Sequence, residues 1–115
     1  MQLWSGTSQL ANWSDGLSSL SSYLSINNIS NYKEIMIILG NSMGGRTQNQ
    51  FVLERNPKTT WVEKVSSYGG LYTDTYFTIT AVGVDFTNNR VYGMFKSNGW
   101  SFTQILVGVY GRYSL

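Results

Sequence analysis

Residues 72–110 decide the fold, and they read YTDTYFTITAVGVDFTNNRVYGMFKSNGWSFTQILVGVY. Thr, Tyr, Phe, Ile and Val dominate residues 72–86, and these residue types are enriched in β-strands. The turn Thr87-Asn88-Asn89 follows, and Asn tolerates the positive φ of a tight hairpin. Asn98-Gly99 is a second and stronger hairpin signal. The segment therefore predicts three successive antiparallel strands, at 72–86 with a bulge at Gly83, at 90–96 and at 100–110.

Shorter strands of the same kind are expected nearer the N-terminus. Residues 32–39 contain a continuous apolar run, which predicts a strand buried on both faces. Further strands are expected at 20–26, 51–55 and 61–65, and the Ser-rich stretch 18–25 is a weak helix former. We therefore predict one all-β domain over residues 1–115, an antiparallel, jelly-roll-like β-sandwich with little helix. The side chains expected to face inward are Ile35, Ile37, Leu39, Phe77, Ile79, Ile105, Val107 and Val109.

The composition excludes several classes of protein. Charged residues make up 12% of the chain, the net charge is +2, and 40 of the 115 residues are Ser, Thr, Asn or Gln. Aromatic residues reach 15%, which argues against disorder. No two basic residues are adjacent, whereas a nucleic-acid binder normally shows a basic cluster. The longest aliphatic run, 35–39, is far shorter than the roughly 20 residues of a membrane helix. The first six residues lack the basic and apolar regions of a signal peptide. We therefore expect no nucleic-acid binding, no membrane insertion and no export signal.

The residue types needed for catalysis are scarce. The chain has no Cys and no His, which removes thiolate chemistry and the commonest acid/base group and metal ligand. Residues 40–44 match the G-x-S-x-G pattern of a hydrolase nucleophile. A serine triad needs a histidine base, however, and residues 46–51 show no apolar helix face, so a glycine-rich hairpin loop is expected instead. We expect no catalytic residue, no metal site and no cofactor. A glycosidase needs a carboxylate pair, and the available carboxylates are Asp15, Glu34, Glu54, Glu63, Asp74 and Asp85.

Aromatic side chains beside turns are the best candidates for binding. A ring can cover the C–H groups of a sugar while short polar side chains meet its hydroxyl groups, although Tyr and Trp are equally typical of protein interfaces. Recognition sites on a sandwich are usually loops that the strands hold in place. The polar loop 40–50, the Gly-Gly turn at 69–70 and the hairpin at 98–99 are such loops. The predicted ligand-binding residues are Trp100, Tyr68, Tyr72, Arg46 and Asn49.

Apolar strand faces also predict self-association. Tyr72, Tyr76, Tyr92 and Met94 offer more apolar surface than one small core needs. A symmetric homo-oligomer would bury this surface.

Three stretches resemble a known family. The opening Leu3-Trp4-Ser5-Gly6 is similar to the start of small β domains found at the C-termini of bacteriophage tail and baseplate proteins. Residues 22–35, SYLSINNISNYKEI, resemble the strand, turn and strand of the same domains. Residues 105–112 resemble their terminal strand, with Val109-Tyr110-Gly111 at its end. The resemblance spans nearly the whole chain, but residues 40–70 have no match in it.

The resemblance implies a β-sandwich receptor-binding head of a tail fibre or baseplate, located in the virion. Such heads are usually homotrimers that bind host cell-surface saccharides and adjoin other tail or baseplate proteins. The chain is then expected to be the C-terminal part of a longer tail protein and not an enzyme. The family offers no binding residue to carry over. A structural trimerisation cap without receptor binding and a carboxylate-dependent polysaccharide depolymerase stay open as alternatives.

Overall fold

The computed structural model describes residues 1–13, 16–41, 49–58, 60–69, 77–98 and 104–115. Strands make up 69% of the structure, and no helix in the described part reaches seven residues. The expected all-β domain with little helix is therefore confirmed, and no described helix is long and apolar enough to cross a membrane. The elements are β1 (Gln2–Gln9), β2 (Ala11–Asn12), the 3-10 helix η1 (Leu17–Ser19), β3 (Leu24–Ser25), the 3-10 helix η2 (Ile29–Asn31), β4 (Tyr32–Asn41), β5 (Asn49–Glu54), β6 (Trp61–Gly69), β7 (Phe77–Asp85), β8 (Arg90–Asn98) and β9 (Gln104–Ser114).

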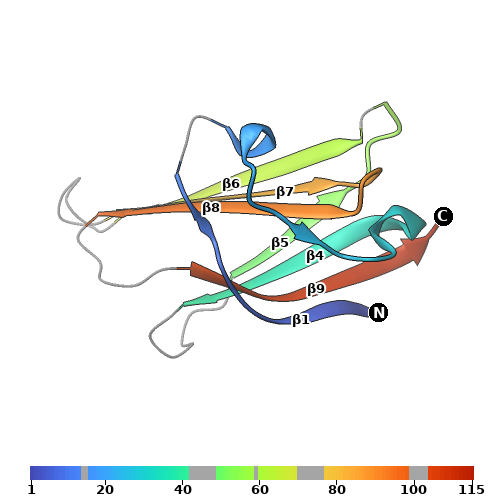
Figure 1. Ribbon diagram of the computed structural model, residues 1–115, viewed down its shortest axis with the longest axis horizontal. Coiled ribbons are helices and arrows are strands. Elements are labelled where there is room, and N and C mark those ends of the chain that lie inside the picture. The colour runs from blue at the N-terminus through green and yellow to red at the C-terminus, as the bar shows by residue number, and fades with distance from the viewer. Residues whose placement is uncertain (14–15, 42–48, 59, 70–76, 99–103) are drawn as a thin grey trace.

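The strands form two sheets that pack face to face as a β-sandwich (Figure 1). Sheet A has the strand order β1-β9-β4-β5. Sheet B has the order β2-β8-β7-β6, and the short strand β3 also pairs with β8. The ladders between long strands are antiparallel, whereas the two-residue pairing of β2 with β8 is parallel. The predicted antiparallel sandwich is thus confirmed.

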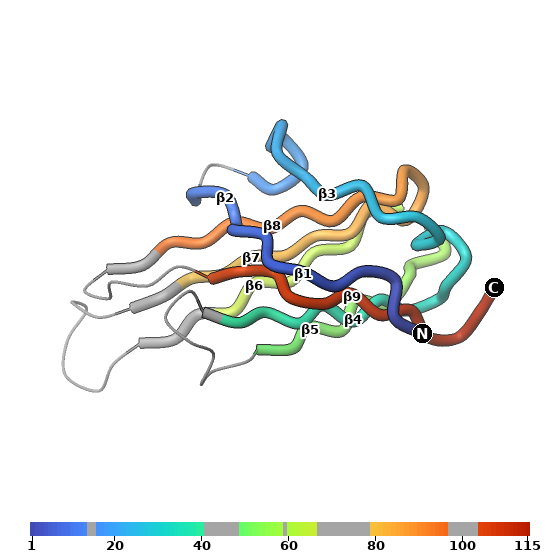
Figure 2. The backbone as a smooth tube through the Cα atoms, turned by 60° about the horizontal axis from the view of Figure 1, so that its bottom comes forward, coloured from blue at the N-terminus to red at the C-terminus, as the bar shows by residue number. Residues whose placement is uncertain are grey.

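One stretch of chain connects the two sheets along the same side of the sandwich. β1 pairs with β9 at the edge of sheet A, and Leu10 then leads into β2 at the edge of sheet B (Figure 2). The chain next runs over the outer face of sheet B through η1 and returns to the edge of β8 as β3. We call residues 10–13 and 16–23 the covering segment.

The main core lies between the sheets and confirms part of the predicted inward set. Ile35, Ile37 and Leu39 of β4 are fully buried, as is Val109 of β9. Residues from β5, β7 and β8 complete this cluster, because alternate side chains of a strand point to one face of the sheet. The prediction that the apolar run 32–39 is buried on both faces is wrong, since Met36 and Ile38 on the outer face of sheet A are only half-buried.

The predicted inward positions Ile105 and Val107 of β9 are wrong. Leu106 is 3% exposed and faces the core, whereas Ile105 and Val107 are half-buried on the other face. The cause is a β-bulge: Ile38 pairs with Gly108 and Leu39 pairs with Leu106, so Val107 is an extra residue in the ladder. An extra residue reverses the alternation beyond it. Val109 on one side of the bulge and Leu106 on the other therefore share the inner face.

Two predictions for β7 are also wrong. The ladders of β7 with β6 and β8 run without a register shift, so Gly83 is not a bulge. Gly83 instead gives room to the Trp61 ring, since a Cβ atom at Gly83 would lie 2.5 Å from Trp61 Cη2. Val82 and Val84 of β7 face the core, so the alternation of the strand directs Ile79 to the other face, where it is half-buried. The side chain of Phe77 lies outside the described residues.

The covering segment differs from the predicted strand at 20–26. It contains η1 and ends before β3, a strand of two residues. Leu17 of η1 is 2% exposed and packs with Ala81, Tyr92 and Met94 in a second cluster on the outer face of sheet B. The sequence predicts that Tyr92 and Met94 are spare apolar surface. This prediction is wrong, because the covering segment packs over both side chains. The other two residues of that prediction, Tyr72 and Tyr76, lie outside the described residues.

The hairpin between β7 and β8 confirms the turn predicted at 87–89. Asn89 has a positive φ of 57°, and the Asp85 carboxylate accepts hydrogen bonds from the backbone N–H groups of Thr87 and Asn88 at 3.0 Å. Burial alone would raise the pKa of Asp85. The hydrogen bonds from Asn88 and Thr87, with the charge of Arg90, outweigh burial and hold this pKa below its ordinary value.

Candidate functional site

The structure describes two of the five predicted ligand-binding residues. Asn49 begins β5, is half-buried and pairs with Leu39. Tyr68 belongs to β6, where its backbone pairs with Thr78. Arg46, Tyr72 and Trp100 lie outside the described residues.

The strands that flank the predicted loops end on the same side of the molecule. Asn41 of β4 pairs with Gln104 of β9, and Phe77 of β7 pairs with both Gly69 of β6 and Asn98 of β8. Figures 1 and 2 show these strand ends together at the left end of the sandwich. Gln104 is 5% exposed there, and its Oε1 atom accepts no hydrogen bond within the described structure. The topology therefore anchors the predicted loops at one end, and their own geometry is not described.

A cleft of about 140 Å³ lies where the chain crosses from sheet A to sheet B. We call it the crossover cleft. One wall comes from the end of β1 and the start of the covering segment, and the other comes from the end of that segment and β3. The edge of β8 lies between them. The lining residues are Ser8, Gln9, Leu10, Ala11, Ser22, Tyr23, Leu24, Ile37, Val82, Val91, Tyr92, Gly93 and Leu106.

The crossover cleft has an apolar floor and a polar rim. Its floor reaches the main core at Ile37, Val82 and Leu106, each of which is buried. Its rim carries short polar or aromatic side chains, among which Gln9, Ser22 and Tyr23 are exposed. Among the described residues that line it, none is Asp, Glu, Lys or Arg. The cleft is therefore suited to binding an uncharged group and holds no carboxylate for acid/base chemistry.

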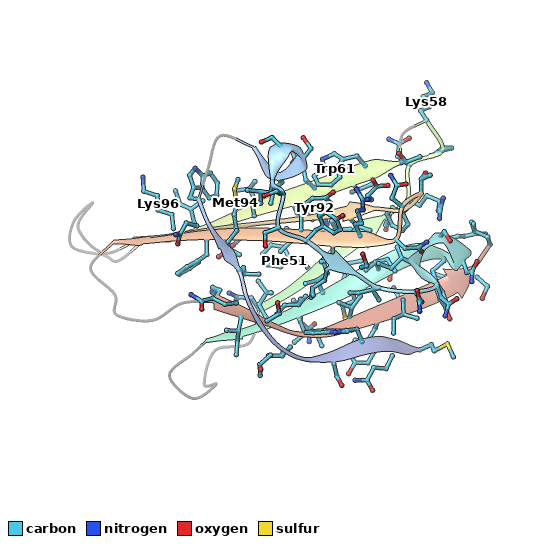
Figure 3. All side chains as sticks on the ribbon, viewed as in Figure 1. Phe51, Lys58, Trp61, Tyr92, Met94 and Lys96 are labelled. Atoms are coloured by element: carbon cyan, nitrogen blue, oxygen red, sulfur yellow. The ribbon has the colours of Figure 1, made fainter. Side chains whose placement is uncertain are left out.

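Three aromatic rings extend from the cleft across the outer face of sheet B. Tyr23 contacts Tyr92 with 5.4 Å between ring centroids. Trp61 contacts Tyr92 edge-on, with 5.1 Å between their ring centroids. Figure 3 shows the labelled Trp61, Tyr92 and Met94 on the outer side of sheet B. Such aromatic contacts add stability beyond the area they bury. The row therefore fixes the wall of the cleft.

Arg90 holds Tyr23 in place without entering the cleft. Its guanidinium lies 4.2 Å from the centroid of the Tyr23 ring, a cation–π contact. A hydrogen bond to the Tyr92 side chain raises the pKa of Arg90 above its ordinary value. Arg90 and Tyr92 both contact the Tyr23 ring, and Tyr23 still keeps 39% of its surface exposed. Tyr23 is thus an oriented ring with surface left for a ligand.

The edge of β8 has a gap in its pairing at the cleft. β3 pairs with Arg90 and Val91, and β2 pairs with Met94 and Phe95. Between these short ladders, Tyr92 and Gly93 have no strand partner on this edge within the described residues. Backbone polar groups at an unpaired edge are available to other partners. Because main-chain groups of alternate residues point to the same edge, Gly93 and not Tyr92 directs its groups to this gap.

Two carboxylates that face each other across neighbouring strands lie outside the cleft. Glu34 and Glu54 are opposite each other on β4 and β5, on the outer face of sheet A. Glu34 Oε1 accepts a hydrogen bond from Arg112 Nε at 2.8 Å, and the Glu34 side chain is only 9% exposed. This geometry fits an ion pair that holds β4 to β9. Within the described residues, no group of three or more Asp and Glu side chains could hold a metal ion.

The sequence reasoning missed the residues that form the crossover cleft. Tyr23 stands in the Ser-rich stretch, and no turn or motif singles it out. For its partner Tyr92, the sequence predicts a place on an apolar face available for self-association. Both residues meet only because a remote segment returns to the edge of β8, and local pattern does not contain that information. Comparison with protein-family models, curated proteins and solved structures finds no match to this chain.

Proposed function

We propose that this chain is a receptor-binding domain of a bacteriophage tail or baseplate that recognises a glycan on the host cell surface. The observation that carries the proposal is the crossover cleft, where an oriented Tyr ring meets polar side chains and the described lining contains no Asp, Glu, Lys or Arg. An aromatic face packs on the C–H groups of a sugar, and hydroxyl and amide groups bond its hydroxyls. The cleft thus offers both kinds of contact at one place.

The location in a virion rests on two sequence features. The chain is rich in uncharged polar residues and aromatic residues and has no Cys or His. The stretches 3–6, 22–35 and 105–112 resemble C-terminal β domains of phage tail proteins. Both features fit the structural protein of an extracellular particle.

Self-association would strengthen weak sugar binding. Several copies linked in one particle bind a polyvalent surface far more tightly than one copy does. The outer face of sheet A supports this part of the proposal, because Met36, Ile38 and Val52 are only half-buried there. The same face favours the second candidate function, a trimerisation cap without receptor binding.

A glycan array tests the proposal, and the chain provides a matched pair of variants. Tyr23→Ala removes an exposed ring with Arg90 over it, and Tyr113→Ala removes another, which is 59% exposed with Arg112 4.6 Å from its centroid. We expect the labelled parent protein to bind bacterial surface glycans. Tyr23→Ala should bind about tenfold more weakly, because interface Tyr residues often dominate binding energy. Tyr113→Ala should bind like the parent.

Each alternative predicts a different result. A parent protein that binds no glycan but forms stable oligomers would favour the trimerisation cap. Release of reducing ends from a bound polysaccharide would favour the depolymerase. Equal binding by Tyr23→Ala and the parent would show that the crossover cleft is not the glycan site.

A further inference from the structure

The floor of the crossover cleft discriminates between chemical groups. The half-buried side chains of Leu10 and Leu24 present hydrocarbon there, and the buried Ile37, Val82 and Leu106 line the same cleft. A hydroxyl group that reached this floor would lose its hydrogen bonds to water without replacement. A methyl group would gain from leaving water. The floor therefore favours a ligand that ends in a small apolar group.

A hydrogen-bond donor lies beside this floor. Main-chain groups of alternate residues in a strand point to the same edge. Phe95 O accepts from Trp13 N and Asn89 O accepts from Ile26 N on the outer edge of β8, so Gly93 directs its N–H to the same edge. The ladders with β2 and β3 stop on either side of Gly93. This N–H thus faces the edge of β8 that borders the cleft.

The size of the cleft and the residues at its rim indicate the size, polar groups and charge of the ligand. An apolar cavity of about 150 Å³ admits one benzene ring, so the crossover cleft of about 140 Å³ takes a single ring or a smaller group. Ser22, Gln9 and Tyr23 are exposed lining residues, and their polar groups suit the hydroxyl groups of a sugar. No charged residue is among the described lining, so the preferred ligand is neutral.

We propose that the crossover cleft binds a neutral N-acetylated hexosamine through its acetamido group. The methyl lies on the apolar floor, the carbonyl accepts a hydrogen bond from Gly93 N–H, and the ring hydroxyls meet the rim. The proposal rests on the glycan-binding function above and narrows it to one class of sugar. One methyl burial and one hydrogen bond together give about tenfold preference over the parent hexose.

Ligand-observed saturation-transfer NMR on the whole chain tests this assignment. The probes are N-acetylglucosamine, N-acetylgalactosamine and N-acetylmannosamine, each beside its parent hexose. We expect the strongest transfer at the acetyl methyl of at least one probe and about tenfold weaker binding of its parent hexose. Equal binding of each acetylated sugar and its parent, or transfer to ring protons alone, would overturn the assignment.

Two neighbouring serines supply the matched variants. Ser22→Leu places a branched side chain at the mouth of the cleft, and Ser21→Leu makes the same change at an exposed residue that does not line it. Ser22→Leu should remove the acetyl signal, and Ser21→Leu should keep it. Unchanged signal in Ser22→Leu overturns the acetamido assignment. If the array shows Tyr23-dependent binding of glycans without acetamido groups, the proposed function stands and this inference alone fails.

Discussion

The long strands of both sheets are antiparallel, and the two sheets differ in what covers their outer faces. On sheet B, Tyr92 is 6% and Met94 is 4% exposed, because Leu17 and Leu20 of the covering segment pack over them. On sheet A, Met36 and Ile38 occupy equivalent outward positions and are only half-buried. Alternation within a strand thus assigns a side chain to a face. Whether that face is covered depends on a segment far away in the sequence.

The outer faces of the two sheets also differ in the interactions that they carry. Sheet A keeps an ion pair on its outer surface, between Glu34 and Arg112. Sheet B buries its outer surface in a second apolar cluster and gains the crossover cleft where the cover begins and ends. Breaking the cover should therefore cost much more stability than comparable changes on sheet A or at exposed sites.

The largest effect is expected from Leu17→Ala. Leu17 is 2% exposed and anchors the cover, so its truncation leaves a cavity and should lower the free energy of unfolding by about 2–5 kcal/mol. Urea denaturation measures the loss. Leu115→Ala is the control, because Leu115 is 68% exposed and its truncation should change stability by less than about 0.5 kcal/mol. Similar losses for the two variants would mean that the covering segment does not anchor sheet B.

A smaller effect is expected from glycines on the two outer faces. A Cβ atom at Gly83 on sheet B would lie 2.5 Å from Trp61 Cη2, whereas one at Gly40 on sheet A would lie 3.5 Å from Val107 Cγ1. Gly83→Ala should cost about 1–3 kcal/mol through overpacking. Gly40→Ala should change stability by less than about 1 kcal/mol, because its contact is ordinary and alanine restricts the unfolded chain.

A double-mutant cycle identifies the cause of the Gly83 effect. Trp61→Leu removes the ring that the added methyl would strike, so Gly83→Ala should cost much less in that background. Additive losses in the Gly83→Ala, Trp61→Leu protein would contradict the packing of Trp61 on Gly83.

The smallest effect concerns the hairpin turn, which belongs to neither face. The pKa of Asp85 is lowered in the folded chain, mainly by hydrogen bonds from Asn88 and Thr87 that outweigh its burial. Its stabilising contribution is therefore fully present above the unfolded pKa of about 3.9 and is lost as the pH falls through the folded pKa. Asp85→Ala should be less stable than the parent at pH 7, and the deficit should shrink below about pH 4. A deficit that stays constant from pH 7 to pH 2 in urea titrations would exclude this role for the carboxylate.

The sequence was sufficient for the sandwich and its main core strand. The hairpin at 87–89 and the inward set Ile35, Ile37 and Leu39 follow from turn chemistry and period-two alternation, which are local properties. The inward set on β9 failed because the bulge at Val107 depends on the pairing with β4. No residue of β9 alone signals that extra position.

The candidate site was harder to predict for a related reason. The predicted residues are attached to loops, and only Asn49 and the backbone of Tyr68 fall within the described structure. The crossover cleft instead combines residues 8–11, 22–24 and 91–93 with three core side chains. Strand pairing across the length of the chain brings them together, and neither composition nor spacing encodes such pairing directly.

The pairing of β1 with β9 sets the time at which the molecule can close during synthesis. Gln2 lies opposite Tyr110, so the first strand has no partner until the last one has been made. At typical rates of about 5–20 residues per second, the ribosome needs about 5–20 s to make the roughly 100 residues between them. The meander of β6, β7 and β8 needs only neighbouring strands and can form earlier. The crossover cleft contains residues of both β1 and β9. It is therefore among the last features of the nascent chain to be completed.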